Sequence, residues 1–213
     1  MHSLPKAATV SIRRIERITA ANAYARAKGL NGLVAISNNY SLARMVEPTW
    51  PGCLASSDPD SRAWFTKAQM PLISWSSQAC GFFARGREED RSETALVRSW
   101  YSADNFRRLE RAKELAAKYH VSPTNIALAY VLCQPFLTFA IVGPGSVDRL
   151  RETLPALEIS LTPAELRWLN LEVQYPGSSN HTLAGGDPVM TKASPDWKWL
   201  VKPGSVLCRI EWI

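Results

Sequence analysis

The stretch MPLISWSSQACG (residues 70–81) begins with apolar residues and ends with small and polar ones. Its first half, Met70 to Trp75, is the kind of short apolar run that forms a buried strand. Its second half, residues 76–81, has the composition of a loop. A loop of small residues directly after a strand is suited to wrapping a ligand. The stretch therefore predicts a strand whose carboxyl end carries a candidate binding site.

Similar units lie on both sides of this stretch. Leu33 to Ile36 predicts a second buried strand, and Phe136 to Val142 predicts a third. Apolar spacing and capping residues predict helices over residues 12–29, 58–68, 104–119, 123–132 and 146–154. Strands that alternate with helices pair in parallel through right-handed crossovers. The fold class is therefore α/β, and three such units are too few to close an eight-stranded barrel.

The end of the chain divides into a helix and a tail. A helix is expected over residues 162–172, because Thr162-Pro163-Ala164-Glu165 matches a capping box. The residues after Glu172 are rich in Gly, Ser and Pro and have no sustained helical period. We therefore expect one domain over residues 1–172 and an irregular tail over residues 173–213.

Composition narrows the class of protein. The chain has 213 residues, of which 46% are hydrophobic and 21% charged, as in ordinary globular proteins. It has neither an uninterrupted apolar run of membrane-spanning length nor an apolar signal segment at its start, so a cytoplasmic location is expected.

The four cysteines (Cys53, Cys80, Cys133, Cys208) lack metal-binding spacing, which argues against a zinc site and favours buried or half-buried thiols.

Several blocks of the sequence, taken in order, are similar to the later part of an aldo/keto reductase. They are NAYA (22–25) with Gly29-Leu30, NYSL (39–42), PLISWSSQACGFF (71–83), IALAYVL (126–132), and AIVGP (140–144) followed by LTPAEL (161–166). The similarity extends over about residues 12–172 and corresponds to the C-terminal half of the family's barrel. It implies a partial (β/α)8 TIM barrel.

The resemblance also implies a function. Members of this family bind NADP(H) at the C-terminal mouth of the barrel and reduce aldehydes and ketones, so NADP and a small carbonyl substrate are the expected ligands. The family's catalytic Asp, Tyr, Lys and His lie on earlier strands. We therefore expect a truncated chain that begins after them, has no catalytic residue and is inactive alone. The alternative is a non-catalytic remnant that binds a dinucleotide or a partner.

Eight residues are candidates for cofactor binding, some from the resemblance and others from their place between a strand and a helix. Trp75 matches an aromatic that stacks on nicotinamide, although a core or rim aromatic is the other interpretation. Ser76, Gln78 and Cys80 match positions at the pyrophosphate and ribose. Gly143 and Gly145 lie between a strand and a helix, where free N–H groups attract phosphate. Arg149 suits the 2′-phosphate or is a solvated arginine, and Thr153 replaces an Asn that faces the adenine.

Other features support different interpretations. The net charge of +6 suits a polyphosphate ligand or nucleic acid, and residues 116–132 resemble a helix-turn-helix. The second helix of that segment is almost entirely apolar, so it is expected to be buried and nucleic-acid binding is not expected. Tyr40 and Tyr130 are interpreted as packing residues, and His2, His120 and His181 as surface residues. An interrupted parallel sheet also leaves open edges that favour self-association.

Overall fold

Residues 8–174 are described by the computed structural model. They form a four-stranded sheet in which neighbouring strands run parallel, in the order β1-β2-β3-β4. The strands are β1 (Ala8–Ser11), β2 (Leu33–Ser37), β3 (Leu72–Ser74) and β4 (Thr138–Ala140). Because strand order follows chain order and helices lie in each connection, the α/β class is confirmed.

The helices between and after the strands differ in length and in how they begin. They are α1 (Ile15–Ala27), α2 (Pro59–Ala68), α3 (Phe82–Arg85), α4 (Thr94–Trp100), α5 (Ala103–Tyr119), α6 (Pro123–Leu132), α7 (Val147–Thr153) and α8 (Pro163–Leu169), with 3-10 turns η1 (Ala79–Gly81) and η2 (Leu154–Glu158). The side chains of Asp58, Ser122 and Ser146 cap α2, α6 and α7. The cap at Asp58 and the helix start after Ser122 are as the sequence predicted.

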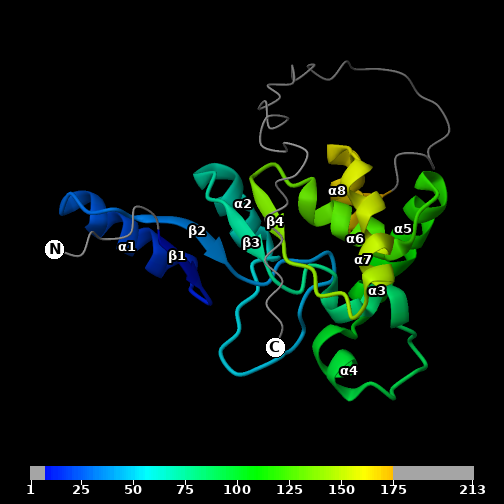
Figure 1. Cartoon of the computed structure of the whole chain (residues 1–213). Helices are drawn as coiled ribbons and strands as arrows, with labels where there is room; N and C mark the ends of the chain where they lie inside the picture. The colour runs from blue at the N-terminus through cyan, green and yellow to red at the C-terminus, as the bar shows by residue number, and fades with distance from the viewer. Residues whose placement is uncertain (1–7, 175–213) are drawn as a thin grey trace. The chain divides into compact units, whose positions relative to one another are not determined.

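The core lies between the sheet and the helices that cover it. Helices α5, α6 and α8 lie together as one group, with α2 beside the strands (Figure 1). Phe65 of α2 stacks on Phe136 with ring centroids 5.2 Å apart, and Tyr40 packs on both Phe136 and Tyr130. All four aromatic rings are buried. The interpretation of Tyr40 and Tyr130 as packing residues is therefore confirmed.

The first strand was not predicted from the sequence. A helix was expected to begin at Ile12, whereas β1 occupies residues 8–11 and α1 begins at Ile15. Ile12 has a φ of +54°, in the left-handed region, so the chain turns sharply between the strand and the helix. The first strand is short and alternates between half-buried and exposed residues, so it lacks the apolar run that marked the other strands.

Other differences concern lengths and boundaries. Strands β3 and β4 are shorter than predicted, because only residues 72–74 and 138–140 pair with one another. Helix α4 was not predicted, and α8 ends at Leu169 rather than at Glu172. The irregular tail expected over residues 173–213 lies outside the described residues except for 173 and 174. None of the helices in the described part has both the length and the apolar character needed to cross a bilayer.

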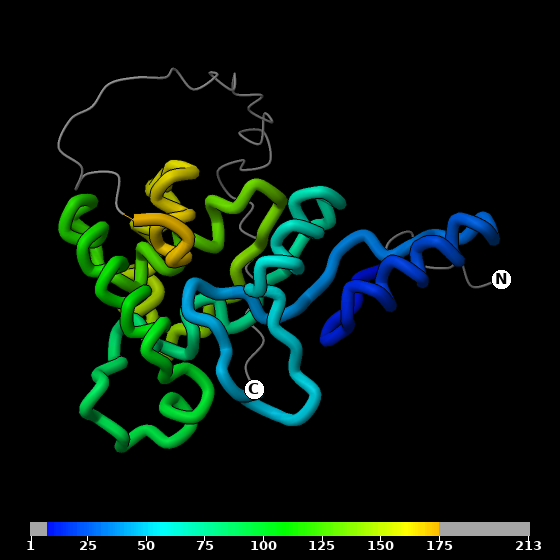
Figure 2. Tube along the Cα trace, turned by 180° about the vertical axis from the view of Figure 1, so that it is seen from behind, coloured from blue at the N-terminus to red at the C-terminus, as the bar shows by residue number. Residues whose placement is uncertain are grey.

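Within the described residues, β4 and its flanks expose apolar side chains. Phe139 of β4 and the flanking residues Leu137 and Ile141 are 53%, 51% and 47% exposed, whereas Thr138 is buried. Figure 2 shows the long segment between β2 and α2 leaving the sheet as a loop before the chain returns. Within residues 8–174, β1 and β4 each have one paired neighbour and thus form the edges of the sheet. An apolar strip therefore lies along an open strand edge.

Helix α8 begins with the capping box that the sequence predicted. Glu165 donates its backbone N–H to Thr162 Oγ1 (3.2 Å) and accepts the N–H of Thr162 at Oε2 (2.8 Å). Its carboxylate also accepts hydrogen bonds from Lys118 and Tyr119 of α5. Burial alone would raise the pKa of Glu165, but the hydrogen bonds from Lys118 and Thr162 outweigh burial and lower it. One carboxylate thus both caps α8 and fixes it to α5.

We predict that Glu165→Gln lowers the free energy of unfolding by about 1–2 kcal/mol at neutral pH, through the loss of charge-assisted bonds. A lowered folded-state pKa adds stability that is present above the unfolded value, about 4.3, and is lost as pH falls through the folded value. The difference between the variant and the natural chain should therefore shrink in acid. Urea unfolding at neutral pH and below pH ~4 measures it.

Glu158→Gln is the matched control, because Glu158 is exposed and makes no ion pair among the described residues. A loss of stability that is equal at both pH values, or equal to that of the control, would contradict the role assigned to Glu165.

Candidate functional site

The carboxyl ends of β2, β3 and β4 meet at one edge of the sheet, because the strands are parallel. Side chains tie the segments that leave these strands. Ser74 Oγ donates to the carbonyl of Tyr40 (2.5 Å), and Ser77 Oγ donates to the carbonyl of Ile141 (2.7 Å). Both serines are buried. The loops at this edge are therefore fixed to one another by the chain itself.

The loop after β3 has an unusual backbone. Ser76, Ala79 and Cys80 have φ values of +47°, +50° and +51°, which are left-handed and uncommon for residues other than glycine. Gly81 follows at +86°, and a Cβ there would lie 3.1 Å from Arg85 Nε. Arg85 Nη2 in turn donates to the carbonyl of Cys80 (2.7 Å). Strained backbone of this kind is common at ligand sites.

This loop faces the β4–α7 connection across a cleft of about 940 Å³, which we call the strand-end cleft. The start of α6 forms a further wall. Seven of the eight predicted cofactor residues line it: Ser76, Gln78, Cys80, Gly143, Gly145, Arg149 and Thr153. Arg149 Nη1 lies 3.7 Å from the position of a Cβ on Gly145, so the guanidinium lies close to the loop.

The thiols are only partly as expected. Cys53 is buried and Cys133 is half-buried, but Cys80 is exposed, so the expectation of a shielded thiol is wrong for Cys80. The left-handed turn at residues 79–81 places Cys80 at the surface of the cleft. Cys208 lies outside the described residues.

Several lining residues were not predicted. Arg85 lies on helix α3, which was not predicted, and Lys113 and Asn125 lie on α5 and α6, whose sequences indicated only helices. Arg85, Lys113 and Arg149 give the cleft three cationic side chains, against the single carboxylate of Glu152. Arg85 and Lys113 pair with Glu93 and Glu110, whereas Arg149 makes no ion pair within residues 8–174. Arg149 is therefore available to an anionic ligand.

Two polar atoms at the cleft have no partner. Gln78 Nε2 and Asn125 Oδ1 are buried and make no hydrogen bond to any described residue. Leaving a buried donor or acceptor unpaired costs about 1–3 kcal/mol. One of these atoms is a donor and the other an acceptor, and both residues line the cleft. This pair matches a ligand that carries hydrogen-bond donors as well as acceptors, as the hydroxyl and amide groups of a nucleotide do.

Trp75 does not line this cleft. Its ring packs on that of Trp50, with centroids 4.6 Å apart and planes tilted by 35°. Its backbone carbonyl accepts a hydrogen bond from Asn39 Nδ2 (3.0 Å), so it is held at the ends of β2 and β3. Its indole Nε1 is buried without a partner among the described residues. The structure thus separates Trp75 from the other seven predicted residues.

The cleft lining contains no tyrosine, histidine or aspartate within the described residues. Burial raises the pKa of both Tyr40 and Tyr130, which opposes any role in proton transfer. His120 is exposed at the end of α5, whereas His2 and His181 lie outside the described residues. No group of three or more potential metal ligands occurs in the part of the chain that the structure describes.

Comparison with known proteins identifies the family. A sequence model of the aldo/keto reductase family matches residues 6–170. The chain belongs to the aldo/keto reductase family. The similarity recognised in its sequence is thereby confirmed, and with the parallel sheet it confirms the expected partial TIM barrel.

Individual relatives match parts of the chain. An uncharacterized oxidoreductase of Bacillus subtilis is 34% identical over 107 residues, which is 50% of this chain and 33% of the relative. An aryl-alcohol dehydrogenase [NADP(+)] of Phanerodontia chrysosporium is 26% identical over 183 residues, or 79% of this chain and 44% of the relative. A crystal structure of a thermostable aldo-keto reductase aligns with a TM-score of 0.45 at 20% identity, covering 71% of this chain and 44% of its own. The chain thus spans less than half the length of these three proteins.

Proposed function

We propose that this aldo/keto reductase chain binds NADP(H) in the strand-end cleft. The observation that carries the proposal is the convergence of seven residues, from the loop at 76–81 and from residues 143–153, on one cleft at the carboxyl ends of the strands. In α/β proteins, ligands bind at this edge of the sheet. The family resemblance assigns Ser76, Gln78 and Cys80 among them to the cofactor.

The charge of the cleft supports a phosphate-bearing ligand. Arg85, Lys113 and Arg149 line it, and Arg149 makes no ion pair among the described residues. A guanidinium at the start of a helix pairs well with a phosphate. The NADP(+) in the name of the Phanerodontia chrysosporium relative also favours the 2′-phosphorylated cofactor.

The residues fit this group in other respects. Gln78 and Asn125 carry the unpartnered donor and acceptor that ribose hydroxyls or the adenine ring would satisfy. Thr153 borders the same cleft. Hydride donation to a carbonyl carbon is the chemistry that bound NADPH supplies. Trp50 covers one side of Trp75, so a nicotinamide stacked on that side must displace Trp50.

A small carbonyl compound is the substrate class that we propose for the complete catalytic unit, on the basis of family membership. The relatives named aryl-alcohol dehydrogenases support a compound with an aryl group. A second candidate is dinucleotide binding without turnover, by this chain alone. It is favoured because no tyrosine, histidine or aspartate from the described residues lines the cleft.

The proposed site predicts that NADPH binds more tightly than NADH, by about tenfold or more. A charge-assisted hydrogen bond contributes roughly 1.5–3 kcal/mol, and each 1.4 kcal/mol is tenfold. Arg149→Ala should abolish the preference without changing the affinity for NADH. Titration calorimetry measures both. Arg151→Ala is the control, because Arg151 lies on the same helix but not on the cleft. Equal affinities for the two cofactors in the natural chain would refute this assignment.

We further predict that the purified chain does not oxidise NADPH in the presence of aldehydes or ketones. General acid catalysis contributes roughly 10²–10⁴-fold, and preorganised electrostatic stabilisation a similar factor. By resemblance, the residues that supply both lie on strands before those matched here. Loss of NADPH absorbance with a panel of carbonyl compounds is the assay. NADPH oxidation that persists through purification and disappears in Trp75→Ala would show that the prediction of an inactive chain is wrong.

We also propose that the chain self-associates along the open edge of β4. The apolar strip of Leu137, Phe139 and Ile141 lies along the open edge of β4. A lysine on an edge strand opposes such pairing. Phe139→Lys should therefore shift the chain towards monomer in sizing chromatography with light scattering. Val147→Lys, which changes an exposed apolar residue of α7, should not. A natural chain that is monomeric at all concentrations would contradict the proposal.

A further inference from the structure

A second hollow lies among the helices, away from the strand ends. It has a volume of about 730 Å³ and lies between α2, the end of α6 and α8; we call it the helix groove. It shares no lining residue with the strand-end cleft. Its size is that of small-molecule sites. Nothing in the proposed cofactor binding makes use of it.

The walls of the groove are mainly apolar. Proline, alanine and leucine side chains from three segments face it: Pro59, Ala63, Pro135, Leu161, Pro163 and Leu166. Such walls offer contact to a ring or a short hydrocarbon chain and offer nothing to an inorganic ion. An occupant therefore needs an apolar body.

The charged residues of the groove are predominantly positive. Arg62, Lys67 and Arg167 line it, against the single carboxylate of Glu172. Glu172 Oε1 accepts from Arg62 Nη1 at 2.6 Å. Lys67 and Arg167 are exposed and make no ion pair within the described residues. The groove thus has an excess of two positive charges and calls for an anionic occupant.

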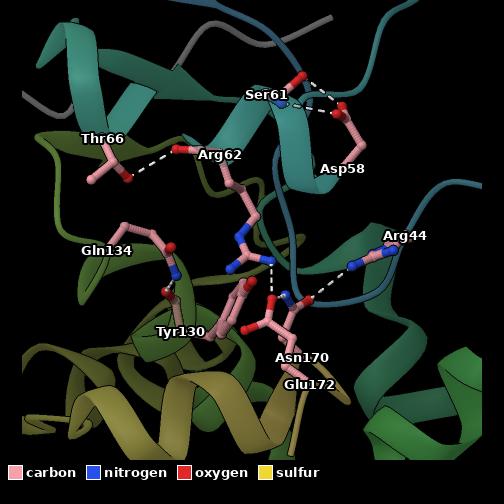
Figure 3. Close-up of polar contacts among 9 residues, drawn as sticks. All are labelled: Arg44, Asp58, Ser61, Arg62, Thr66, Tyr130, Gln134, Asn170 and Glu172. Carbon is pink, nitrogen blue, oxygen red and sulfur yellow. Dashed lines mark hydrogen bonds and ion pairs between the residues drawn. The ribbon is translucent and has the colours of Figure 1, made fainter. Parts of the chain in front are cut away.

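Arg62 is held in position, yet some of its hydrogen-bond donors have no partner among the described residues. Figure 3 shows its guanidinium beside Tyr130 and Glu172, and Asn170 in turn links Glu172 to Arg44. Arg62 Nε is buried without a hydrogen-bond partner among the described residues. Burial alone would lower the pKa of Arg62, but Tyr130, Tyr40 and Glu172 outweigh it and raise the pKa. The cation is therefore permanent and has donors to spare.

A buried polar side chain completes the site. Tyr130 borders the groove yet is only 2% exposed. Its ring stacks on that of Tyr40, with centroids 6.1 Å apart, which fixes its position. The charged end of the groove is thus backed by rigid aromatic core rather than by solvent.

We infer that the helix groove binds a small amphipathic organic acid, with its carboxylate on Arg62 and the rim cations and its apolar body against the proline and leucine walls. This inference is independent of the proposed cofactor site, because the two hollows have no residue in common. Charge complementarity selects the acid group, and the apolar walls select an organic acid over a bare anion.

The test uses 4-phenylbutyrate as the probe and its neutral amide, 4-phenylbutanamide, as the matched control ligand. Titration calorimetry on the full chain at low salt measures both. The acid is expected to bind at least about tenfold more tightly than the amide, because a charge-assisted bond contributes roughly 1.5–3 kcal/mol. Inorganic phosphate is expected to bind more weakly than the acid. Equal affinity for acid and amide, or phosphate binding as tightly as the acid, would overturn the inference.

Variants then locate the site. Arg167→Gln removes a rim cation and leaves the pair of Arg62 with Glu172 intact, so it should weaken acid binding several-fold without loss of folding. Arg26→Gln, an exposed arginine at the end of α1, and Arg149→Ala, in the strand-end cleft, should leave acid binding unchanged. Circular dichroism confirms that each variant folds. Acid binding that is insensitive to Arg167→Gln, or lost in Arg149→Ala, would place the acid elsewhere and refute the assignment.

Discussion

Parallel strand pairing is the constraint on which the rest of this structure depends. Because β2, β3 and β4 run in the same direction, their carboxyl ends meet at one edge, and each connection must return through a helix. Ser74 and Ser77 use this geometry, since each donates to a carbonyl of a neighbouring segment. The side chain of Ser77 therefore ties the loop at 76–81 to the segment at 141–146 before any ligand arrives, which is the preorganisation that close phosphate binding requires.

The packing of the helices is organised by charge as well as by apolar contact. Glu165 fixes α8 to α5, and the chain of contacts from Arg62 through Glu172 and Asn170 to Arg44 connects α2, the end of α8 and the segment after β2. Exposed pairs of this kind contribute little stability, but partly buried ones set the relative positions of helices. The helix groove lies where this network meets apolar walls.

The sequence allowed prediction of those features that depend on local patterns. Apolar runs indicated three strands, and caps at Asp58, Ser122 and Thr162 indicated helix starts, because a cap needs only neighbouring residues. One strand and three residues could not be predicted from local patterns. Strand β1 was missed since Ala8–Ser11 lacks an apolar run. Trp50 lies in a loop far from Trp75 in sequence, and Lys113 and Asn125 reach the cleft only through helix packing. Tertiary contacts alone decide such positions.

Amide hydrogen exchange with and without NADPH tests most directly whether the two loops at the strand ends hold the phosphates of NADP(H). We expect slower exchange at residues 76–81 and 143–149 when NADPH is present, because backbone N–H groups there become hydrogen-bonded. We expect no change at residues 59–67 and 161–167, which line the helix groove. Unchanged exchange in both loops at saturating NADPH, or protection confined to the helix groove, would contradict this role of the loops.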